Sequence, residues 1–468
     1  MPPRPIPWRG YSNGGRREPS GSYHTFGMAR AAGSSYLQVI QRQETYGRGP
    51  IAMTGHDLTQ LRIDGERLWG RLMTMAQHGA TAKGGVCRLT GSDEDKAGRD
   101  LFVDWCRAAG CEVTVDAIGN IFARRPGRDD SGGAVLAHSH LDSQPTGGKF
   151  DGVYGVLAAL EVVETLNDNG IETDAPVEIG AWTNEEGARF APALIGSGVF
   201  TGVFALEEMR AVTDKEGLAL GDELARIGYA GEAAPGDRRI KAAFEVHIEQ
   251  GPILEAEEKT IGAVGGVQGM RWYDLVLEGQ EAHAGPTPME HRRDPFQALV
   301  RILPEIYAQA GANAPWGRAT FGDIKAEPGS RNTVPGRLTV AVDLRHPEQE
   351  VLEQMDRDFH AAVERECAAL GIAGRIEPVW DCPAVKFDAD CVAAVRRGAE
   401  VTGYPALEIV SGAGHDSVYL SRIAPVGMVF IPCEGGLSHN EAENATPEDV
   451  TAGCNVLLHA VLSQAGTP

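Results

Sequence analysis

The sequence predicts an α/β protein in which a mixed-sheet α/β domain carries a smaller, inserted α+β domain. Two short apolar runs, 134–137 and 177–182, flank a helical stretch at 156–167. This order is typical of a strand–helix–strand unit with parallel strands. The block 262–381 has a different rhythm, with strands that alternate in polarity and two amphipathic helices. After residue 382 the α/β pattern returns, so the smaller domain is predicted to be an insertion.

The first part of the larger domain is expected to span 53–261. Apolar residues recur at helical spacing over 61–77, and a second helix is predicted at 94–109. The segment 112–122 is predicted to be a hairpin that turns at Gly119-Asn120. The strand–helix–strand unit follows, and polar side chains stand directly after both of its strands. Ligand sites of open α/β sheets lie at the carboxyl ends of strands.

The inserted domain is expected to span 262–381. Strands are predicted at 273–277 and 338–344, because polarity alternates there, and helices at 295–308 and 350–370. The second part of the larger domain, 382–468, is predicted to contain a strand at 426–431 and a closing helix at 447–462.

Residues 1–52 differ from the rest of the chain. They contain seven arginines and two acidic residues, with many Gly, Pro and Ser. Such a segment is expected to be disordered. A transit peptide and a twin-arginine signal at Arg16-Arg17 are alternatives, but no apolar stretch follows the arginines. The preferred interpretation is a start assigned too far upstream, with Met28 or Met53 as the true beginning.

Composition limits the classes of partner. The net charge of −22 over 468 residues disfavours nucleic acid and anionic membrane surfaces, so a small-molecule substrate is expected. The longest uncharged apolar run, 152–160, falls short of the ~20 residues that span a bilayer. Eight cysteines without a CxxC pair disfavour a thiolate zinc site and are typical of a reducing cytoplasm.

Two candidate ligands lie near the first strand. In an extended segment His140 and Asp142 point to the same side, so His140 could bind a metal while Asp142 orients its ring. Asp151 stands among glycines, which allow the backbone to approach an ion closely. Taken alone, the HxD tripeptide is better explained as a chance occurrence than as a site, and an ordinary surface turn explains Asp151 equally well.

Further candidates follow later strands. Glu185 and Glu186 are adjacent carboxylates at a strand end, where one could bind a metal and the other could face a water molecule. His247 lies on an alternating strand, and His439 lies in a loop after the strand at 426–431. An acidic surface turn, a satisfied strand histidine and a solvated loop histidine are the alternatives. Together, three histidines and two carboxylates match the ligand set of a binuclear hydrolase.

Seven motifs occur in a fixed order: Ser139–Ser143 (SHLDS), Gly147–Gly152 (GGKFDG), Thr183–Gly187 (TNEEG), Val246–Gly251 (VHIEQG), Ala282–Met289 (AHAGPTPM), Gly412–Asp416 (GAGHD) and Ser438–Asn440 (SHN). From Asp57 to the C-terminus the chain resembles the carbamoylase branch of the M20 metallopeptidase/amidase family. That branch includes N-carbamoyl-L-amino-acid hydrolases, β-ureidopropionase and allantoate amidohydrolase.

The resemblance implies two divalent ions, zinc, manganese, cobalt or nickel. Asp151 would bridge them, His140 and His247 would complete one site, and Glu186 and His439 the other. Glu185 would be the general base. Peptidase members carry a carboxylate at the position of His247, so this histidine favours the amidase branch. The Asp151–Gly152 peptide would be cis, as is common in the family.

The resemblance also implies a homodimer. The insertion would act as lid and dimerisation domain and would supply His283 across the interface, while Asn332 and Arg345 would face the substrate. Gln250 and His415 would line the pocket. The catalytic residues would be Glu185, Asp142 and His283. Without the resemblance, an ion pair with Asp343 is the simpler interpretation of Arg345.

The implied reaction is hydrolysis of the carbamoyl C–N bond of an N-carbamoyl-amino acid or related ureido acid, which releases amino acid, ammonia and carbon dioxide. One alternative is an M20 aminoacylase or dipeptidase with the same metals. Another is an allantoate or ureidoglycolate amidohydrolase of purine breakdown. A catalytically dead metal-binding module is disfavoured, because the expected base, Glu185, is present.

Overall fold

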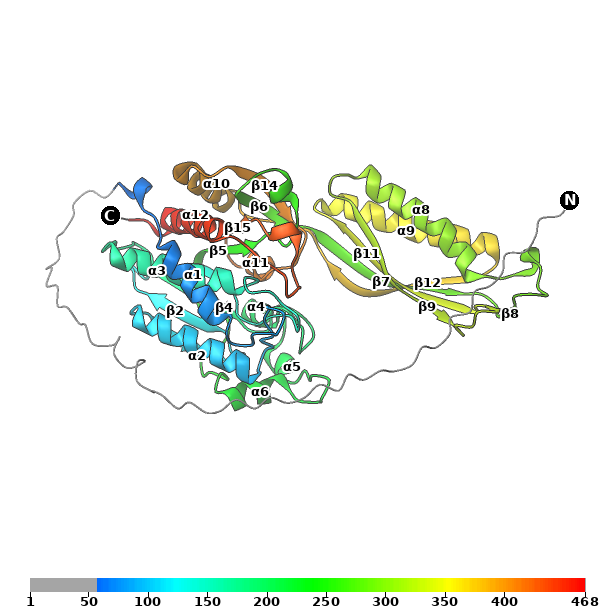
Figure 1. The fold of residues 1–468 in the computed structure, drawn as a ribbon, viewed down its shortest axis with the longest axis horizontal. Coiled ribbons are helices and arrows are strands. Elements are labelled where there is room, and N and C mark those ends of the chain that lie inside the picture. The colour runs from blue at the N-terminus through cyan, green and yellow to red at the C-terminus, as the bar shows by residue number, and fades with distance from the viewer. Residues whose placement is uncertain (1–56, 468) are drawn as a thin grey trace, which may run out of the picture. The chain divides into compact units, whose positions relative to one another are not determined.

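The computed structural model describes residues 57–467, so the expected leader at 1–52 lies outside the described residues. Nine strands form the large sheet, in the order β1-β2-β4-β3-β5-β15-β6-β13, and β14 pairs with β6 (Figure 1). Their bounds are β1 Glu112–Val115, β2 Ile121–Arg125, β3 Ala134–His140, β4 Val177–Trp182, β5 Ile240–Ile248, β6 Ile261–Val267, β13 Val385–Lys386, β14 Ala406–Ser411 and β15 Val426–Ile431.

The centre of this sheet is parallel, as predicted. β3 pairs in parallel with both β4 and β5, and β15 pairs in parallel with β5. All residues of β3, β4 and β15 are buried, which explains their continuous apolar runs. The carboxyl ends of these strands therefore meet at one edge of the sheet. The predicted hairpin is present as antiparallel β1 and β2.

Helices cover both faces of the large sheet. The elements are α1 Gly65–Met75, α2 Asp93–Ala108, α3 Val153–Asp168, α4 Ile195–Phe200, α5 Leu206–Arg210, α6 Leu220–Ile227, α7 Ile253–Ala256, α10 Ala389–Thr402, α11 Asp416–Leu420 and α12 Pro447–Ala465, with short 3₁₀ turns at η1 Leu58–Gln60 and η3 Glu434–Gly436. One core cluster joins Val135 and Ala137 of β3 to α1, α3 and α12. Their neighbour Leu136 points to the other face, into a cluster with α4 and α11.

A second sheet of four strands, in the order β12-β7-β11-β9, forms the smaller domain. Its elements are β7 Gly269–Glu278, β9 Arg318–Glu327, β11 Arg337–His346 and β12 Ala373–Cys382, with α8 Pro295–Ala312, α9 Gln349–Leu370, the ribbon strands β8 Ala282–His283 and β10 Thr333–Val334, and the turn η2 Met289–His291. Leu338, Val340 and Val342 of β11 pack with α8 and α9 in a third core cluster.

Two features of this region differ from the expected pattern. Four strands are present where two were predicted, because most residues of β9 and β12 are exposed and give no apolar alternation. The segment 262–381 also includes most of β6, which pairs with β14 and β15 of the large sheet. The small sheet itself begins at Gly269.

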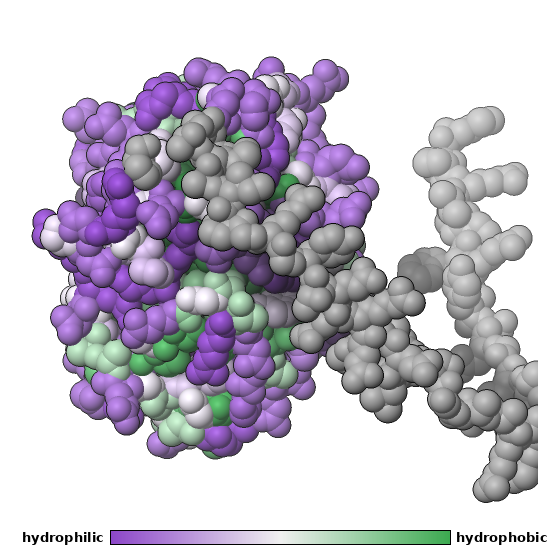
Figure 2. Space-filling view, turned by 90° about the vertical axis from the view of Figure 1, so that its left-hand side faces the viewer, coloured by the Kyte–Doolittle hydropathy of each residue, from purple (hydrophilic) through white to green (hydrophobic). Residues whose placement is uncertain are grey.

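Surface and cysteines agree with the composition. The face in Figure 2 is mostly hydrophilic, with small apolar patches in its lower half. None of the helices in the described part of the chain is long and apolar enough to cross a membrane. All eight cysteines are free thiols.

Close packing of α12 on the sheet provides a stability test. A Cβ at Gly453 would overlap the Tyr154 hydroxyl, which donates to the Val450 carbonyl, and would lie 2.5 Å from Ile431 Cγ2. We expect Gly453→Ala to lower the free energy of unfolding by about 1–3 kcal/mol through overpacking. The midpoint of thermal unfolding measures this loss.

The matched control is Gly70→Ala within α1, where a Cβ would meet nothing within 4 Å. Helix propensity alone should raise stability there by about 0.5–1 kcal/mol. A stabilising Gly453→Ala would contradict the packing described for α12.

Candidate metal centre

Three adjacent parallel strands bring the candidate ligands to one edge of the large sheet. His140 is the last residue of β3, His247 is next to last in β5, and Glu185 and Glu186 follow β4. His439 lies in the loop after β15. Asp151 precedes α3, at the N-terminal end of the crossover from β3 to β4. The predicted gathering of these residues at strand ends is thus present in the structure.

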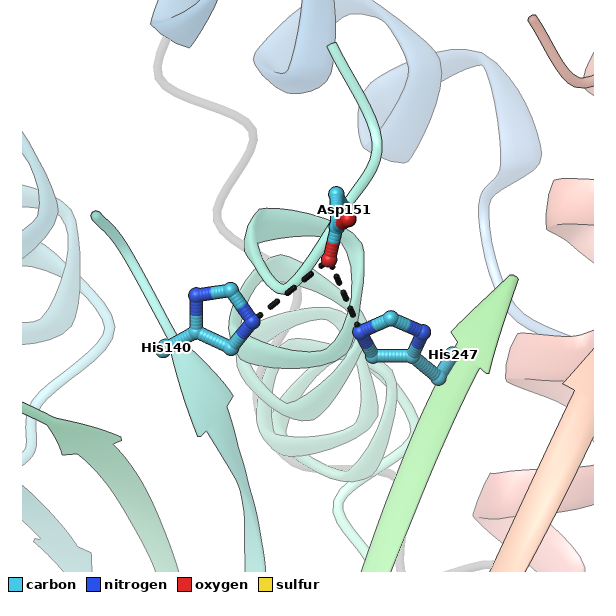
Figure 3. Close-up of side chains that lie close together, drawn as sticks. All are labelled: His140, Asp151 and His247. Atoms are coloured by element: carbon cyan, nitrogen blue, oxygen red, sulfur yellow. Dashed lines mark ion pairs between the residues drawn. The ribbon is translucent and has the colours of Figure 1, made fainter. Parts of the chain in front are cut away.

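Asp151 is the common neighbour of the three histidines. Its Oδ1 lies 3.2 Å from His247 Nε2 and 3.6 Å from His140 Nε2. Figure 3 shows the two imidazole rings on either side of this carboxylate. Its Oδ2 lies 3.5 Å from His439 Nε2, which is also 3.3 Å from Glu186 Oε2. Asp151 thereby belongs to two groups that could each hold a metal ion, one with His140 and His247 and one with Glu186 and His439.

The donor atoms suit a metal in type and spacing. Imidazole nitrogen and carboxylate oxygen are the ligands of zinc and related divalent ions. Two such atoms bound to one ion at ~2.0–2.1 Å in tetrahedral geometry lie about 3.3 Å apart. The nitrogen–oxygen separations here, 3.2–3.6 Å, fall around that value. The residues present therefore fit a pair of divalent ions that share Asp151.

A third group of possible ligands comprises Glu245, His247 and His415. Both oxygens of Glu245 are already engaged, since they accept hydrogen bonds from Ser139 (2.9 Å) and Ser417 (2.7 Å). This carboxylate instead anchors the strand ends beneath the centre.

Main-chain carbonyls orient the two buried histidines. His140 Nδ1 lies 3.0 Å from the carbonyl oxygen of Asp142, and His247 Nδ1 lies 2.9 Å from that of Ile248. With the Nδ1–H donating to a carbonyl, each Nε2 keeps its lone pair on the side of Asp151, and that of His247 accepts the backbone N–H of Gly152 at 3.2 Å. The expected contact from the Asp142 carboxylate is replaced by its main chain, because the side-chain oxygen is 3.8 Å away.

The Asp142 carboxylate has a different task. Its two oxygens accept the backbone N–H groups of Glu185 and Glu186, each at 3.2 Å. It therefore fixes the turn after β4 and points both glutamates into the centre.

Glycine at position 152 is required by the geometry. Gly152 has φ 66°, and a Cβ there would overlap the His140 ring. The Asp151–Gly152 peptide is trans, in contrast to the cis bond implied by the family resemblance; the cis bonds among residues 57–467 precede Pro192, Pro315 and Pro328.

The buried carboxylates repel one another. Burial and Asp151 raise the pKa of Glu186 to about 8, although Gln144 donates to this carboxylate from its backbone N–H (3.1 Å) and its side chain (2.8 Å). Burial raises the pKa of Glu185 well above its usual range; His140 acts in the opposite direction, and the nearby acids Asp416 and Glu186 raise the pKa further. A bound cation would relieve this repulsion.

The same carboxylates also change the pKa of the histidine His140. Burial lowers the pKa of His140, but the carboxylates of Glu185 and Asp151 outweigh it and raise the pKa well above the usual range. A field that favours a proton on His140 also favours a metal cation beside it.

Most predicted site residues line one pocket of about 210 Å³. It contains His140, Asp151, Glu185, Glu186, His247, His439, Gln250, His415 and Arg345. Gln250 donates to Asp151 Oδ2 at 2.9 Å, and its own carbonyl oxygen is buried without a partner among the described residues. Burial and the neighbouring His247 lower the pKa of His415 to about 3, so its ring is neutral.

Arg345 forms the ion pair with Asp343 that the sequence suggested, and it also lies at the pocket. Its Nε and Nη2 donate to Asp343 at 3.0 and 2.7 Å, so the ion pair is present. Its Nη1 donates to the Gly412 carbonyl at 2.6 Å, which ties the small domain to the loop that carries His415. It also lines the pocket.

Two predicted substrate residues lie apart from this pocket. His283 on β8 and Asn332 before β10 are exposed at the two-stranded ribbon, where the Ala284 N–H donates to the Asn332 carbonyl. Neither residue lines the pocket of its own chain.

Glu443 is a buried neighbour of the centre that sequence reasoning missed. Its Oε1 accepts the backbone N–H groups of Phe150 and Asp151, each at 3.1 Å. Its Oε2 lies 3.0 Å from the Ser438 hydroxyl, which donates to Asp151 Oδ2 at 3.0 Å. Its position four residues after His439 was the one available signal, since it is otherwise one of 65 acidic residues.

Comparison with known proteins agrees with this geometry. The family model described as Peptidase family M20/M25/M40 matches residues 136–463. An N-carbamoyl-L-amino-acid amidohydrolase of Rhizobium meliloti is 48% identical over 86% of this chain and 97% of its own length. An allantoate amidohydrolase of Bacillus subtilis is 34% identical over 82% of this chain and 93% of its own.

A solved structure is also similar throughout. The amidase of the hydantoinase/carbamoylase family from Burkholderia multivorans has 55% sequence identity and a TM-score of 0.85, over 87% of this chain and 99% of its own. The chain therefore belongs to peptidase family M20, and within it to the carbamoylase branch that contains these amidohydrolases.

Proposed function

We propose that this protein is a metal-dependent amidohydrolase that cleaves the carbamoyl C–N bond of N-carbamoyl-amino acids and releases the amino acid, ammonia and carbon dioxide. The observation that carries the proposal is the shared Asp151, which joins two groups of ligands in one pocket beside Glu185. The 48% identity to a Rhizobium meliloti protein named for this activity supports it.

The centre is proposed to hold two divalent ions, of zinc, manganese, cobalt or nickel. His140 and His247 would hold one, Glu186 and His439 the other, and Asp151 would contact both. When bound, such ions lower the pKa of a water molecule and polarise a carbonyl group. A ureido carbonyl is a poor electrophile, so this reaction needs both effects.

Glu185 is proposed as the general base. Its Oε2 lies 3.5 Å from His140 Nε2, at the pocket wall, and forms no ion pair with a Lys or Arg side chain of residues 57–467. From this place it would accept the proton of the attacking water and deliver it to the leaving nitrogen. Asp142 supports this role through the backbone N–H of Glu185.

Substrate recognition is assigned to residues at the pocket rim. The buried, unpartnered carbonyl of Gln250 is placed to accept an N–H of the ureido group. Arg345 is proposed to bind the substrate carboxylate with the N–H groups that Asp343 and Gly412 leave free, since a guanidinium has five donors. The neutral ring of His415 completes this side of the pocket.

A second candidate is an allantoate or ureidoglycolate amidohydrolase. The 34% identity to the Bacillus subtilis allantoate amidohydrolase favours it. Allantoate and ureidoglycolate have the same ureido group and carboxylate as N-carbamoyl-amino acids. An M20 aminoacylase or dipeptidase is the third. After loading with each of the four metals, ammonia release is measured from N-carbamoyl-amino acids, N-carbamoyl-β-alanine, allantoate and ureidoglycolate, and release of the free amino acid is measured from an N-acetyl-amino acid and a dipeptide. Together these measurements separate the three candidates.

The working unit is proposed to be a homodimer in which His283 and Asn332 reach the partner's pocket. Both are exposed and lie apart from the pocket of their own chain. The same domain exposes large apolar side chains on α8 and β9, namely Phe296, Val300, Tyr307 and Ile324. Exposed large apolar side chains that gather on one part of a protein are typical of an interface. The free cysteines support a cytoplasmic location.

Replacement of the base should separate chemistry from metal binding. We expect Glu185→Gln to lower kcat by at least ~10² while the metal content is retained, because the amide cannot accept the proton. Steady-state ammonia release and elemental analysis of the same sample check this. An active Glu185→Gln enzyme would exclude Glu185 as the base.

Glu443 should act through Asp151. Glu443→Gln removes the negative charge that accepts the backbone N–H groups of Phe150 and Asp151, so the backbone that positions the Asp151 carboxylate is held less firmly. We expect metal affinity to fall ~10–100-fold, the range found for partners of metal ligands. Competition with a chelator measures it, and Glu448→Gln, an exposed residue nearby, is the control. Equal affinities in both variants would remove Glu443 from the centre.

Subunit mixing tests whether His283 acts across the interface. Glu185→Gln and His283→Ala should each be nearly inactive as homodimers. An equal mixture, unfolded and refolded together, contains one intact site per heterodimer and should recover about a quarter of wild-type activity. If His283 acted within its own chain, the mixture would stay inactive.

A further inference from the structure

The pocket has an apolar wall that the chemistry at the metal centre does not require. Met270 and Trp272 of β7, Trp380 of β12 and Leu194 line the same cavity as the ligand cluster. Met270 is 3% exposed and Leu194 is 4% exposed, so they are part of the protein interior. Apart from Arg345 of β11, the polar residues of the pocket belong to the large sheet and its loops, whereas this wall comes mainly from the small sheet.

The strand register explains how this wall forms. Tyr273, Leu275 and Leu277 of β7 pack under α8 and α9. Met270 and Trp272 have the opposite parity, so they project from the uncovered face of the small sheet. Trp380 is the register partner of Trp272, and the two ring systems meet edge to face at 4.8 Å between centroids.

The same face carries the proposed carboxylate ligand. On β11, Arg345 is the register partner of Met270, and Asp343 is that of Trp272. The guanidinium and the apolar wall are therefore fixed next to each other on one sheet. An α-amino acid presents this same pair of groups, since its carboxylate and its side chain are both attached to the Cα atom.

The wall is poorly suited to a second polar group. Near it, the Arg345 donors are shared with Asp343 and Gly412, and Trp272 Nε1–H is a buried donor without a partner among the described residues. With the remaining Arg345 N–H groups assigned to the substrate carboxylate, the Trp272 N–H could pair with the carbonyl of a second ureido group but not with its several N–H groups, which would be left desolvated. An apolar side chain needs no such partners and gains from burial against the indoles.

We propose that Met270, Trp272 and Trp380 form a subsite for a large apolar substrate side chain, so that the preferred substrates are N-carbamoyl derivatives of leucine-, methionine- or phenylalanine-like amino acids. This inference rests on the proposed carbamoyl hydrolysis and specifies its substrate class. Allantoate, ureidoglycolate and N-carbamoyl-β-alanine leave the subsite either occupied by polar groups or empty.

The test is kcat/KM for ammonia release by the metal-loaded full-length enzyme across side chains of increasing size. N-carbamoyl-L-leucine and N-carbamoyl-L-phenylalanine should exceed N-carbamoylglycine at least ~100-fold, since each buried methylene contributes ~10-fold or more. N-carbamoyl-β-alanine and allantoate should lie at or below the glycine derivative.

Substitutions of the two tryptophans then test whether the apolar wall causes the side-chain preference. Trp380→Ala and Trp272→Phe should lower kcat/KM for the leucine derivative ~10-fold or more, while the value for the glycine derivative stays within about twofold. The control is Val379→Ala, which alters the residue preceding Trp380 on β12, where the side chain is 58% exposed. It should leave both values unchanged. Thermal unfolding and metal content confirm that each variant is folded and loaded.

The outcomes separate the two levels of the proposal. Equal kcat/KM values for all N-carbamoyl-amino acids, or a preference for allantoate, would overturn the subsite and leave carbamoyl hydrolysis standing. A side-chain preference that survives both tryptophan substitutions would also overturn it. Absence of ammonia release from every carbamoyl substrate would overturn the proposed function and the subsite with it.

Discussion

Charge compensation around one buried carboxylate is the constraint on which the site depends. Asp151 is 6% exposed and lies 3.2–3.6 Å from three imidazole nitrogens, with Glu185 and Glu186 in the same pocket. Such a group of acids is tolerated in a protein interior only with cations or protons nearby. The surrounding residues keep that carboxylate in place. Gly152 leaves room for the His140 ring, Glu443 accepts hydrogen bonds from the adjacent backbone, and Ser438 and Gln250 donate hydrogen bonds to the Asp151 carboxylate.

The large sheet brings these residues together. Parallel β3, β4 and β5 end together, so residues separated by about a hundred positions in sequence meet without long, structured loops. Main-chain carbonyls then set the imidazole orientations, and the Asp142 carboxylate sets the turn that carries both glutamates. The small sheet contributes a different kind of surface, two indoles and a guanidinium, which suits recognition of the substrate rather than attack on it.

Much of this was predictable from the sequence where the signal is local. The apolar runs of β3, β4 and β15 and the polar residues after them located the candidate ligands, and the motif order indicated the family. Other features depend on distant partners. Glu443 meets Asp151 across 292 positions, Trp380 meets Trp272 only through strand register, and exposed β9 and β12 lack an apolar period. The link from His140 to Asp142 was correct in residue but not in atom, because a spacing pattern does not distinguish main chain from side chain.

The most direct test of the central claim is anomalous diffraction from crystals of the manganese-loaded enzyme, collected above and below the metal edge. The proposed centre should give two anomalous peaks per subunit, one beside His140 and His247 and one beside Glu186 and His439, with Asp151 in contact with both. A single peak, or peaks that do not touch Asp151, would contradict it.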